Sequence, residues 1–389
     1  MNIGLDARSI FSPRPRGTGR NLLDAYRLIP ALRPDWRFVL YHQHERDQCP
    51  HANAAVPRWP TNVRLRRLDI PGDRLGAWLQ IRLPLAAWRD GLDLLHLPAN
   101  TAPIYCPVPT VVTVHDLAPL KVPDEASPRQ RRQFRRGIQR ALRSAAHIIT
   151  PSQATCDELC ADFDVDSEHI AIIPWAPDNS LLTESNPAAL TTVRDHYGLN
   201  RPWLLHFSGR ARRKNVAGVI AALRLLPPEI RATYQTVFVG CGTVSERAHL
   251  QDQVIQAGIA DDCRILGFVP HEEVSALLRG AHALLIPSLH EGFGLPILDA
   301  FTCRVPVLAS QCSSLPEVAG DAALYCDPTA PPSIAAGITR IVRDDVRRDL
   351  IRRGAERVSQ FTWERTARQM CEVYQRCRVH KRAAKTCEA

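Results

Sequence analysis

Short apolar runs rich in β-branched residues alternate with longer stretches of helical periodicity through most of this 389-residue sequence. Strands that alternate with helices in this way indicate parallel, doubly wound sheets. The runs form two series, one on each side of Pro174–Asp178, whose prolines suit neither a helix interior nor a central strand. One hydrophobic core also rarely serves a chain of this length. We therefore expect an α/β fold in which two Rossmann-like domains face a cleft, with ligand bound at the carboxyl ends of strands.

The predicted strands are those runs that end in a turn or a polar residue. They are Ile3–Asp6, Phe38–Tyr41, Asp93–His96, Val111–Val114, His147–Thr150, Ala171–Ile173, Trp203–Phe207, Thr236–Val239, Arg264–Gly267, Ala283–Ile286 and Val305–Ala309. The C-terminal stretch from Phe361 has helical spacing, and its large apolar residues Trp363, Met370 and Tyr374 fall on one face. We expect residues 381–389 to form a frayed polar tail.

The formal net charge of +9 is carried by arginine, which is concentrated in one segment. That segment contains Arg129, Arg131, Arg132, Arg135, Arg136, Arg140 and Arg143. A solvated helix face is the ordinary interpretation, and attraction to an anionic membrane surface or a phosphorylated substrate is the alternative. Nucleic acid is not expected as a partner, because no aromatic interleaving or known binding module accompanies the charge.

The N-terminus and the cysteines argue against a secreted or metal-dependent protein. Asp6 and Arg8 interrupt the apolar core that a signal peptide requires, and no run approaches the roughly 18 apolar residues of a membrane span. The twelve cysteines include no CxxC pair, so we expect reduced thiols, no metal and no other cofactor. The predicted location is the cytoplasm, with the basic segment 129–143 allowing peripheral attachment to the inner face of the plasma membrane.

The segment Pro287–Pro306 directly follows the predicted strand Ala283–Ile286 and therefore lies at a strand's carboxyl end. Gly292 and Gly294 allow its backbone to approach a ligand closely. Pro296 suits the first position of a helix, and free amide groups at a helix N-terminus attract a diphosphate. This pattern predicts a turn and helix that bind the phosphates of a ligand.

Two carboxylates, Glu291 and Asp299, stand eight positions apart around this turn. Glu291 precedes the helix and is able to accept hydrogen bonds from sugar hydroxyls. Asp299 is expected in the first helical turn, within reach of a ribose. The alternative is a tight strand-to-helix turn in which Glu291 only caps amides. The combination with Gly-Phe-Gly favours a nucleotide-sugar site.

A second candidate segment, Ser208–Asn215, reads SGRARRKN and follows the strand Trp203–Phe207. A glycine turn with clustered cations suits the two phosphates of a nucleotide, because arginine gives two-point hydrogen bonds and lysine a point charge. A basic surface loop is the alternative. Lys214 is the predicted phosphate ligand, together with either Arg210 or Arg213.

Six further candidate residues lie in the first half of the chain. His115 and Asp116 follow the strand Val111–Val114, where the histidine is able to act as a base or to orient a sugar. Gly17 and Gly19 form a glycine pair between the first strand and a helix expected near Asn21, which alone is weak evidence for a nucleotide site. His96 and Asn100 are candidates for the acceptor side. A histidine in such a position is otherwise a structural residue.

The segment Asp164-Val-Asp166 matches a DxD pattern that binds a metal ion in some enzymes that act on nucleotide sugars. It lies between a predicted helix and the strand Ala171–Ile173, remote in sequence from the other motifs. We interpret it as a solvated turn, and no metal site is predicted.

These segments together resemble family 4 of the retaining glycosyltransferases, whose fold is GT-B, and within it a mannosyltransferase-like subgroup. The resemblance rests on the order of the glycine-rich start, HDL, SGR…RKN, LGFVP, EGFG and the terminal FTW helix along nearly the whole chain. It differs from the family pattern at Asp299, where the second carboxylate is usually Glu, and at Arg304, where the family usually has glycine.

The resemblance implies domains of residues 1–176 with a returning helix 362–380, and 177–361. It implies catalytic roles for Glu291, His115, Lys214 and Arg210. It implies donor binding by Gly17, Gly19, Arg213, Gly292, Phe293, Gly294, Leu295 and Asp299. The acceptor side would include Asp116, His96 and Asn100.

The implied reaction moves a hexose from a nucleotide sugar to a glycan or lipid-linked oligosaccharide in polysaccharide biosynthesis. The first candidate for the donor is GDP-mannose, which supplies mannose. A nucleotide-sugar epimerase or hydrolase of the same fold is the enzymatic alternative, and it would consume donor without acceptor. A dinucleotide-dependent dehydrogenase needs a complete GxGxxG with an acidic residue about twenty positions on, which neither glycine loop supplies. A basic nucleic-acid-binding protein is the non-enzymatic alternative.

Overall fold

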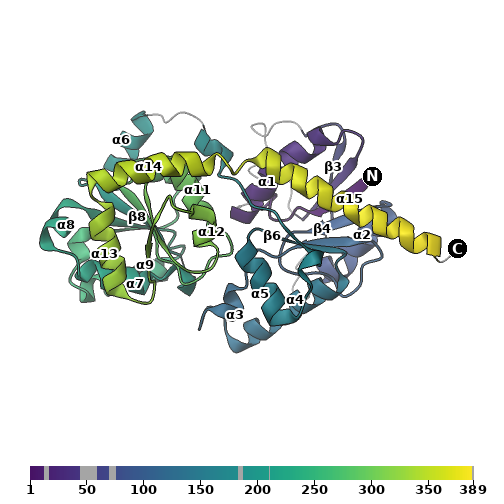
Figure 1. The fold of residues 1–389 in the computed structure, drawn as a ribbon, viewed down its shortest axis with the longest axis horizontal. Coiled ribbons are helices and arrows are strands. Elements are labelled where there is room, and N and C mark those ends of the chain that lie inside the picture. The colour runs from purple at the N-terminus through teal and green to yellow at the C-terminus, as the bar shows by residue number, and fades with distance from the viewer. Residues whose placement is uncertain (13–16, 44–58, 70–75, 183–186, 210, 388–389) are drawn as a thin grey trace. The chain divides into compact units, whose positions relative to one another are not determined.

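The computed structural model describes residues 1–12, 17–43, 59–69, 76–182, 187–209 and 211–387 (Figure 1). By their internal contacts these residues form two compact units. The first comprises residues 1–117, 128–178 and 361–389, and the second comprises residues 118–127 and 179–360. The predicted boundary at residue 176 compares with an observed change of unit after Asp178. The short segment 118–127 belongs with the second unit, which the sequence did not indicate.

The first unit is built on a seven-stranded, all-parallel sheet of order β3-β2-β1-β4-β5-β6-β7. Its strands are β1 (Asn2–Asp6), β2 (Arg37–His42), β3 (Val63–Arg67), β4 (Leu94–Leu97), β5 (Thr110–Thr113), β6 (His147–Thr150) and β7 (Ile170–Ile172). Its helices are α1 (Gly17–Leu32), η2 (Trp78–Arg82), α2 (Leu83–Arg89), α4 (Pro128–Ser144), α5 (Gln153–Phe163), η3 (Ser167–His169) and α15 (Trp363–Cys387).

The second unit is built on a six-stranded, all-parallel sheet of order β10-β9-β8-β11-β12-β13. Its strands are β8 (Trp203–Phe207), β9 (Gln235–Val239), β10 (Cys263–Leu266), β11 (Ala283–Ile286), β12 (Val307–Ser310) and β13 (Leu324–Cys326). Its helices are α3 (Ala118–Lys121), η4 (Asn179–Leu182), α6 (Pro187–His196), η5 (Arg212–Lys214), α7 (Val216–Arg224), α8 (Pro228–Thr233), α9 (Val244–Gln256), η6 (Ala260–Asp262), α10 (His271–Arg279), α11 (Leu295–Thr302), α12 (Leu315–Ala319), α13 (Pro331–Ile341) and α14 (Asp344–Val358).

Each unit has its own apolar core between sheet and helices, as buried parallel strands require. In the first unit Leu95 and Val112 of the sheet pack with Ile138 of α4 and Leu159 of α5. In the second unit, residues of β8, β9, β11 and β12 pack with α7, α9 and α13. The doubly wound α/β prediction is therefore confirmed for each unit.

The C-terminal helix α15 belongs to the first unit and packs along α1 (Figure 1). Its predicted apolar face is buried, and the Trp363 indole donates to the Pro177 carbonyl at 2.8 Å. The Thr366 hydroxyl donates to the Pro174 carbonyl at 2.7 Å. Two hydrogen bonds thus tie the start of this helix to the proline-bearing stretch. The helix continues to Cys387, so the prediction of a frayed tail from residue 381 was wrong over most of that tail.

Two strands of the described chain were missed, and both lie at a sheet edge. β3 reads VRLRR, in which arginines alternate with apolar residues, and β13 has three residues. An edge strand has a neighbouring strand on one side only and is less buried than a central strand, so its sequence carries a weaker apolar signal. None of the described helices is both long and apolar enough to cross a membrane.

Candidate active site

The strand order of each sheet reverses at one pair of neighbours, and ligands of open α/β sheets bind at such a point. In the first unit the pair is β1 and β4, and in the second it is β8 and β11. The connections that leave these strands at their carboxyl ends carry most of the residues predicted from the sequence. Each unit therefore offers one candidate site.

In the second unit the centre of the site is the Glu291 carboxylate, which lies after β11. Its Oε1 accepts hydrogen bonds from Lys214 Nζ at 2.7 Å and from Ser288 Oγ at 2.9 Å. Its Oε2 accepts a short hydrogen bond from Arg213 Nη1. The two cations come from η5, after β8, so the fold joins the two motifs that the sequence singled out separately.

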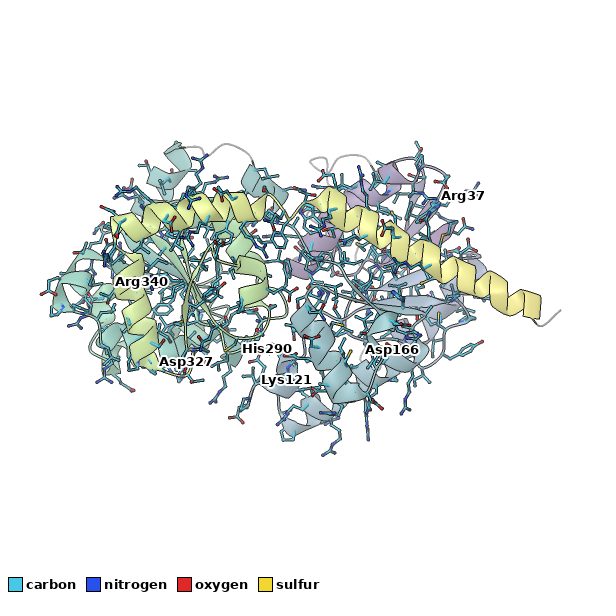
Figure 2. The ribbon with its side chains drawn as sticks, viewed as in Figure 1. Arg37, Lys121, Asp166, His290, Asp327 and Arg340 are labelled. Carbon is cyan, nitrogen blue, oxygen red and sulfur yellow. The ribbon has the colours of Figure 1, made fainter. Side chains whose placement is uncertain are left out.

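The main chain of Glu291 is fixed by two serines that follow β12. The Glu291 N–H donates to Ser313 Oγ at 2.9 Å, and Ser314 Oγ donates to the Glu291 carbonyl at 2.8 Å. The residue is only 7% exposed. Glu291 is therefore held both at its carboxylate and at its main chain, as expected of a preorganised site. Figure 2 shows His290, the residue before Glu291, on the connection that leads from β11 into α11.

Burial alone would raise the pKa of Glu291, because it disfavours the charged carboxylate. The charges of Lys214 and Arg213 oppose this, and hydrogen bonds from Lys214 and Ser288 add to them. The net effect lowers the pKa of Glu291 to about 2. The group is therefore a carboxylate at any physiological pH, and a poor base and nucleophile.

The η5 loop is held against the β11–α11 connection by main-chain contacts. Asn215 adopts a left-handed φ of 59°, and its side-chain amide donates to the carbonyls of Pro287 at 2.9 Å and Pro328 at 2.7 Å. The Leu289 N–H donates to the Arg213 carbonyl at 2.7 Å. These bonds set the register in which Lys214 and Arg213 reach Glu291. Arg210, the other candidate arginine, lies outside the described residues.

The turn before α11 requires its second glycine. Gly294 has φ of 96°, and a Cβ there would stand 2.5 Å from Leu315 Cδ2. The helix begins at Leu295, so Pro296 is its second residue and Asp299 its fifth. The prediction that Asp299 lies in the first turn was therefore wrong. The buried residues Gly292 and Phe293 complete the turn as expected.

Two buried polar atoms near these charges have no hydrogen-bond partner among the described residues. They are His206 Nε2 and Ser208 Oγ, at the carboxyl end of β8. His206 Nδ1 bonds the Leu285 carbonyl at 3.0 Å, so Nδ1 carries the proton and Nε2 is an acceptor. Burial chiefly lowers the pKa of His206 to about 4, and the Lys214 charge adds to the effect. Unpaired polar atoms are costly in a core, so this end of β8 suits a polar ligand.

In the first unit the predicted residues gather around a cavity of about 370 Å³ at the reversal between β1 and β4. Its lining is Ser9, Ser12, Thr18, Gly19, Pro98, Ala99, Asn100 and His115. A Cβ at Gly19 would stand 2.1 Å from the Ser9 carbonyl oxygen, which explains this glycine, whereas a Cβ at Gly17 would meet nothing within 4 Å. Helix α1 begins at Gly17 and not near Asn21, so both glycines lie in its first turn.

His115 is fixed at this cavity by its own backbone and ring. Its N–H donates to Asn100 Oδ1 at 2.7 Å, and its Nε2 bonds the Pro98 carbonyl at 2.8 Å. A carbonyl only accepts, so Nε2 carries the proton and Nδ1 is left as an acceptor. The ring stacks on Trp175 with centroids 5.9 Å apart. Burial lowers the pKa of His115, although the Pro98 carbonyl and the Asp116 charge oppose this, so the ring is neutral at physiological pH.

His96 does not line this cavity, which corrects its assignment to an acceptor site. Its side chain has no exposed surface, and Nε2 bonds Thr113 Oγ1 at 2.8 Å. Its Nδ1 lies 3.1 Å from the Tyr26 hydroxyl and 2.9 Å from the Tyr374 hydroxyl. These two hydroxyls are 2.8 Å apart. The histidine therefore joins β4, α1 and α15 in the core, where an acceptor substrate does not reach it.

Asp116 and the DxD segment lie at the surface of the first unit or partly buried in it. Asp116 is half-buried beside His115. In the DxD segment, Asp164 ends α5 with a left-handed φ of 51°, and Asp166 accepts from the Glu168 N–H at 2.9 Å (Figure 2). Both carboxylates are exposed turn residues, as interpreted from the sequence. Among the described side chains, no group of three His, Cys, Asp or Glu residues is arranged to hold a metal.

Comparison with known proteins agrees with this architecture. The family model described as glycosyl transferases group 1 matches residues 192–357, and the model described as glycosyltransferase family 4 matches residues 25–179. The O-antigen chain mannosyltransferase B of Escherichia coli is 32% identical over 94% of this chain and 98% of its own. The chain is a family 4 glycosyltransferase.

Other relatives of this glycosyltransferase are more distant. The O-antigen chain mannosyltransferase RfbU of Salmonella typhimurium is 27% identical over 59% of this chain and 60% of its own. Among solved structures, sucrose-phosphate synthase from Thermosynechococcus elongatus covers 97% of this chain and 98% of its own with a TM-score of 0.74 at 21% identity. HepE of Anabaena, in complex with UDP and glucose, covers 96% and 99% with a TM-score of 0.74 at 20% identity. These likenesses identify the fold as GT-B.

Proposed function

We propose that this glycosyltransferase moves mannose from GDP-mannose, with retention at the anomeric carbon, to a polysaccharide or lipid-linked glycan. The observation that carries the proposal is the Glu291 carboxylate held between Lys214 and Arg213 where β8 and β11 diverge. The choice of mannose is supported by the 32% identity to an O-antigen mannosyltransferase over nearly the full length of both chains.

Lys214 and Arg213 are the groups that would receive the diphosphate of the donor. Both cations form ion pairs with Glu291, and α11 begins immediately after the turn that carries this carboxylate. A diphosphate would compete with Glu291 for the two cations and leave the carboxylate able to accept hydrogen bonds from sugar hydroxyls. The cations and helix amides would stabilise the charge that develops on the leaving group. We propose that they do so without a metal ion, so that transfer persists in excess chelator.

The engagement of Glu291 argues against its acting as a covalent nucleophile. Both carboxylate oxygens accept hydrogen bonds, and the pKa of about 2 makes the group weakly nucleophilic. We therefore propose attack on the face from which the diphosphate departs. The bond from the anomeric carbon to the diphosphate oxygen breaks, the acceptor oxygen bonds to that carbon, and a donor phosphate oxygen takes the acceptor's proton. Trapping a sugar covalently bound to Glu291 would overturn this mechanism.

The direct test offers a panel of nucleotide sugars to the purified protein, with a mannose-ended oligosaccharide as acceptor. Lys214→Ala is compared with Arg212→Ala, because Arg212 is an adjacent cation that is 62% exposed and outside the Glu291 contacts. We expect GDP-mannose to be used, at least tenfold loss of donor affinity in Lys214→Ala, and little change in Arg212→Ala. Failure to bind any donor, or equal behaviour of the two variants, contradicts the assignment. Donor turnover that needs no acceptor would indicate an epimerase or hydrolase.

We further propose that the acceptor is lipid-linked and that helix α4 contacts an anionic bilayer on the cytoplasmic side of the plasma membrane. The helix carries seven arginines and no acidic residue. Arg129, Arg132, Arg136, Arg140 and Arg143 lie at helical spacing along one side and, with glutamines, line a surface groove of about 900 Å³. Such a row of guanidinium groups attracts anionic headgroups at about 1 kcal/mol for each residue near the surface.

A loop that contacts this helix continues to exposed apolar side chains in the same unit. Gly137 of α4 packs against Thr101, and the same loop continues to Ile104 and Tyr105, which are exposed. The Ile104 N–H donates to Gln80 Oε1 at 2.8 Å, which joins the loop to η2. Exposed aromatic and aliphatic side chains in the same unit as a row of arginines are typical of proteins that contact a membrane interface.

Co-sedimentation with vesicles tests this part of the proposal. We expect binding to phosphatidylglycerol-containing vesicles that falls with salt and is weaker in the double variant Arg132→Gln/Arg136→Gln. The matched control is Arg340→Gln/Arg348→Gln, which removes the same charge from exposed positions on α13 and α14. Equal loss in both variants would assign binding to net charge alone. Tight, salt-dependent binding to duplex DNA instead would favour the nucleic-acid alternative.

A further inference from the structure

Two adjacent carboxylates in the segment 118–127 face two adjacent arginines of η5, and all four belong to the second unit. Asp124 lies 3.4 Å from Arg212, with both side chains more than 60% exposed. Glu125 contacts Arg213, and the two side chains are only 12% and 23% exposed. The two ion pairs are formed by neighbouring residues and differ mainly in burial, so the Asp124–Arg212 pair serves as an exposed control for the Glu125–Arg213 pair.

Glu125 contacts the stem of Arg213, whereas Glu291 contacts its tip. Glu125 Oε2 accepts the Arg213 N–H at 2.8 Å, and Oε1 lies 3.9 Å from Nε. Glu291 takes the terminal Nη1. The arginine is therefore held at its backbone by one carboxylate and at its far end by another.

The local backbone explains why Glu125 reaches η5. After α3, Val122 is buried and Asp124 adopts a left-handed φ of 56°, which turns the chain. The Glu125 N–H donates to the Val122 carbonyl at 3.3 Å and closes the turn. A buried valine and a closed turn together fix the position from which the Glu125 side chain extends.

We propose that Glu125 is a positioning residue for donor binding, which anchors the main chain and stem of Arg213 while the guanidinium tip exchanges Glu291 for the donor diphosphate. The inference rests on the function proposed above. When a diphosphate competes for the tip, the contact with Glu291 is weakened. The contact with Glu125 involves other atoms and is retained, so the arginine stays aimed at the site and less conformational freedom is lost on binding.

Anchoring and simple charge act on ligand binding in opposite directions. Glu125 is a negative charge near a site that takes an anion, so removing it should strengthen diphosphate binding if charge were its only effect. Loss of an anchor should weaken binding instead. The sign of the change therefore distinguishes the two roles.

The experiment measures GDP affinity by calorimetry and the kinetics of transfer for wild type, Glu125→Ala, Glu125→Gln and Asp124→Asn. Glutamine retains an oxygen that accepts the Arg213 N–H, whereas alanine does not. We expect GDP affinity to fall about tenfold in Glu125→Ala, which is the loss typical of one hydrogen bond to a charged group. Glu125→Gln should stay within about threefold of wild type and Asp124→Asn within about twofold, because screened exposed pairs contribute little.

A double-mutant cycle separates positioning from a general effect on the loop. In an Arg213→Ala background, Glu125→Ala should cause little further loss, because the guanidinium that Glu125 helps to aim at the diphosphate is gone, although the N–H at position 213 remains. Unchanged affinity in Glu125→Ala, tighter binding in both Glu125 variants, or full additivity with Arg213→Ala would each overturn the inference. If Glu125→Ala does not fold, Glu125→Asp replaces it; that variant keeps the charge but shortens the reach, and wild-type affinity in it contradicts the anchor.

Failure of the inference is distinguishable from failure of the proposed function. Wild-type protein that binds GDP and transfers mannose, with Glu125 variants that behave like Asp124→Asn, would remove only the role of Glu125. Wild-type protein that neither binds GDP nor uses any nucleotide sugar would remove the proposed function and this inference together.

Discussion

Two buried polar networks, one in each unit, are built from different chemistry. In the first unit Tyr26, His96 and Tyr374 exchange hydrogen bonds among uncharged groups. In the second unit Glu291 is held by the charged groups of Lys214 and Arg213. Both networks join segments distant in sequence. The uncharged network is fully buried, whereas in the charged network Glu291 is buried and the side chains of Lys214 and Arg213 are partly exposed.

The difference indicates what each network is for. The uncharged network binds no ligand charge, and burial chiefly lowers the pKa of His96 to about 3, so the ring stays neutral. Such a network fixes how α15 and α1 pack on the sheet. The charged network has cations that a phosphate is able to take from Glu291, and its neighbours His206 and Ser208 retain unpaired atoms among the described residues. It is suited to an exchange of partners and not to stability alone.

The largest expected effect separates the two networks by function. Glu291→Gln should lower transfer at least a hundredfold, because the sugar loses a charged hydrogen-bond acceptor at the reacting centre. GDP should nevertheless bind several-fold tighter, because the carboxylate no longer competes for Lys214 and Arg213. Calorimetry and single-turnover kinetics measure the two effects. Weaker GDP binding would contradict the proposed exchange, and a Tyr374→Phe control should leave GDP affinity unchanged.

Acid should lower the free energy of unfolding through His96 in the uncharged network and His206 beside the charged network before it affects Glu291. The pKa values of about 3 for His96 and about 4 for His206 lie below the 6.5 of an unfolded chain. The unfolded state therefore binds more protons below pH 6.5, and each histidine should cost about 1.4 kcal/mol per pH unit as pH falls toward its folded value. The contribution of Glu291 persists above its unfolded pKa and is lost only toward pH 2.

Urea unfolding at pH 7.5, 6.5 and 5.5 measures this dependence. We expect little change between the first two values and a loss at pH 5.5. A free energy of unfolding that is constant down to pH 5.5 would show that these rings are not buried neutral groups.

A smaller effect tests whether the uncharged network is only structural. Tyr374→Phe removes one hydroxyl but leaves Tyr26 and His96 paired at 3.1 Å. We expect the free energy of unfolding to fall by about 1 kcal/mol, with kcat for the folded protein unchanged. Thermal denaturation and initial-rate kinetics check the two parts. A change in kcat without loss of stability would show that this network contributes to catalysis and not only to structure.

The smallest effect concerns Arg304, where the family usually has glycine. The residue follows the C-cap Cys303 of α11 and has a left-handed φ of 57°, and the Val305 N–H donates to the Ala300 carbonyl at 2.8 Å. The turn therefore forms with arginine at the cost of an unfavourable backbone conformation. Arg304→Gly should stabilise the protein by about 0.5–1 kcal/mol without altering GDP affinity. Destabilisation in a denaturant series would show that the arginine side chain contributes more than its backbone costs.

The prediction of the fold succeeded where both faces of a strand are buried, and the two strands that it missed both lie at a sheet edge. The central strands β8 and β11 were predicted at their observed bounds, because both faces of a parallel strand are buried and the sequence reads as an apolar run. β3 and β13 escaped because an edge strand needs fewer apolar residues.

The prediction of the site succeeded for residues that stand inside a recognisable local sequence motif. Glu291 and Lys214 were identified from separate motifs, although their contact roles with a donor remain predictions. His96 was misassigned, because a histidine at a strand end looks the same in sequence whether it faces solvent or a tyrosine cluster. Ser313, Ser314 and Glu125 carried no local signal at all.

The sequence by itself determined the two parallel-sheet units and the motif around Glu291, because periodicity and turn chemistry depend on neighbouring residues. The tertiary structure decided which groups hold Glu291. Lys214 is 77 positions away from it and Ser313 is 22, and Glu125 is 88 positions from Arg213. Strand order brings Lys214 and Ser313 to Glu291, and the packing of the segment 118–127 against η5 brings Glu125 to Arg213. Neither contact follows from a local sequence pattern.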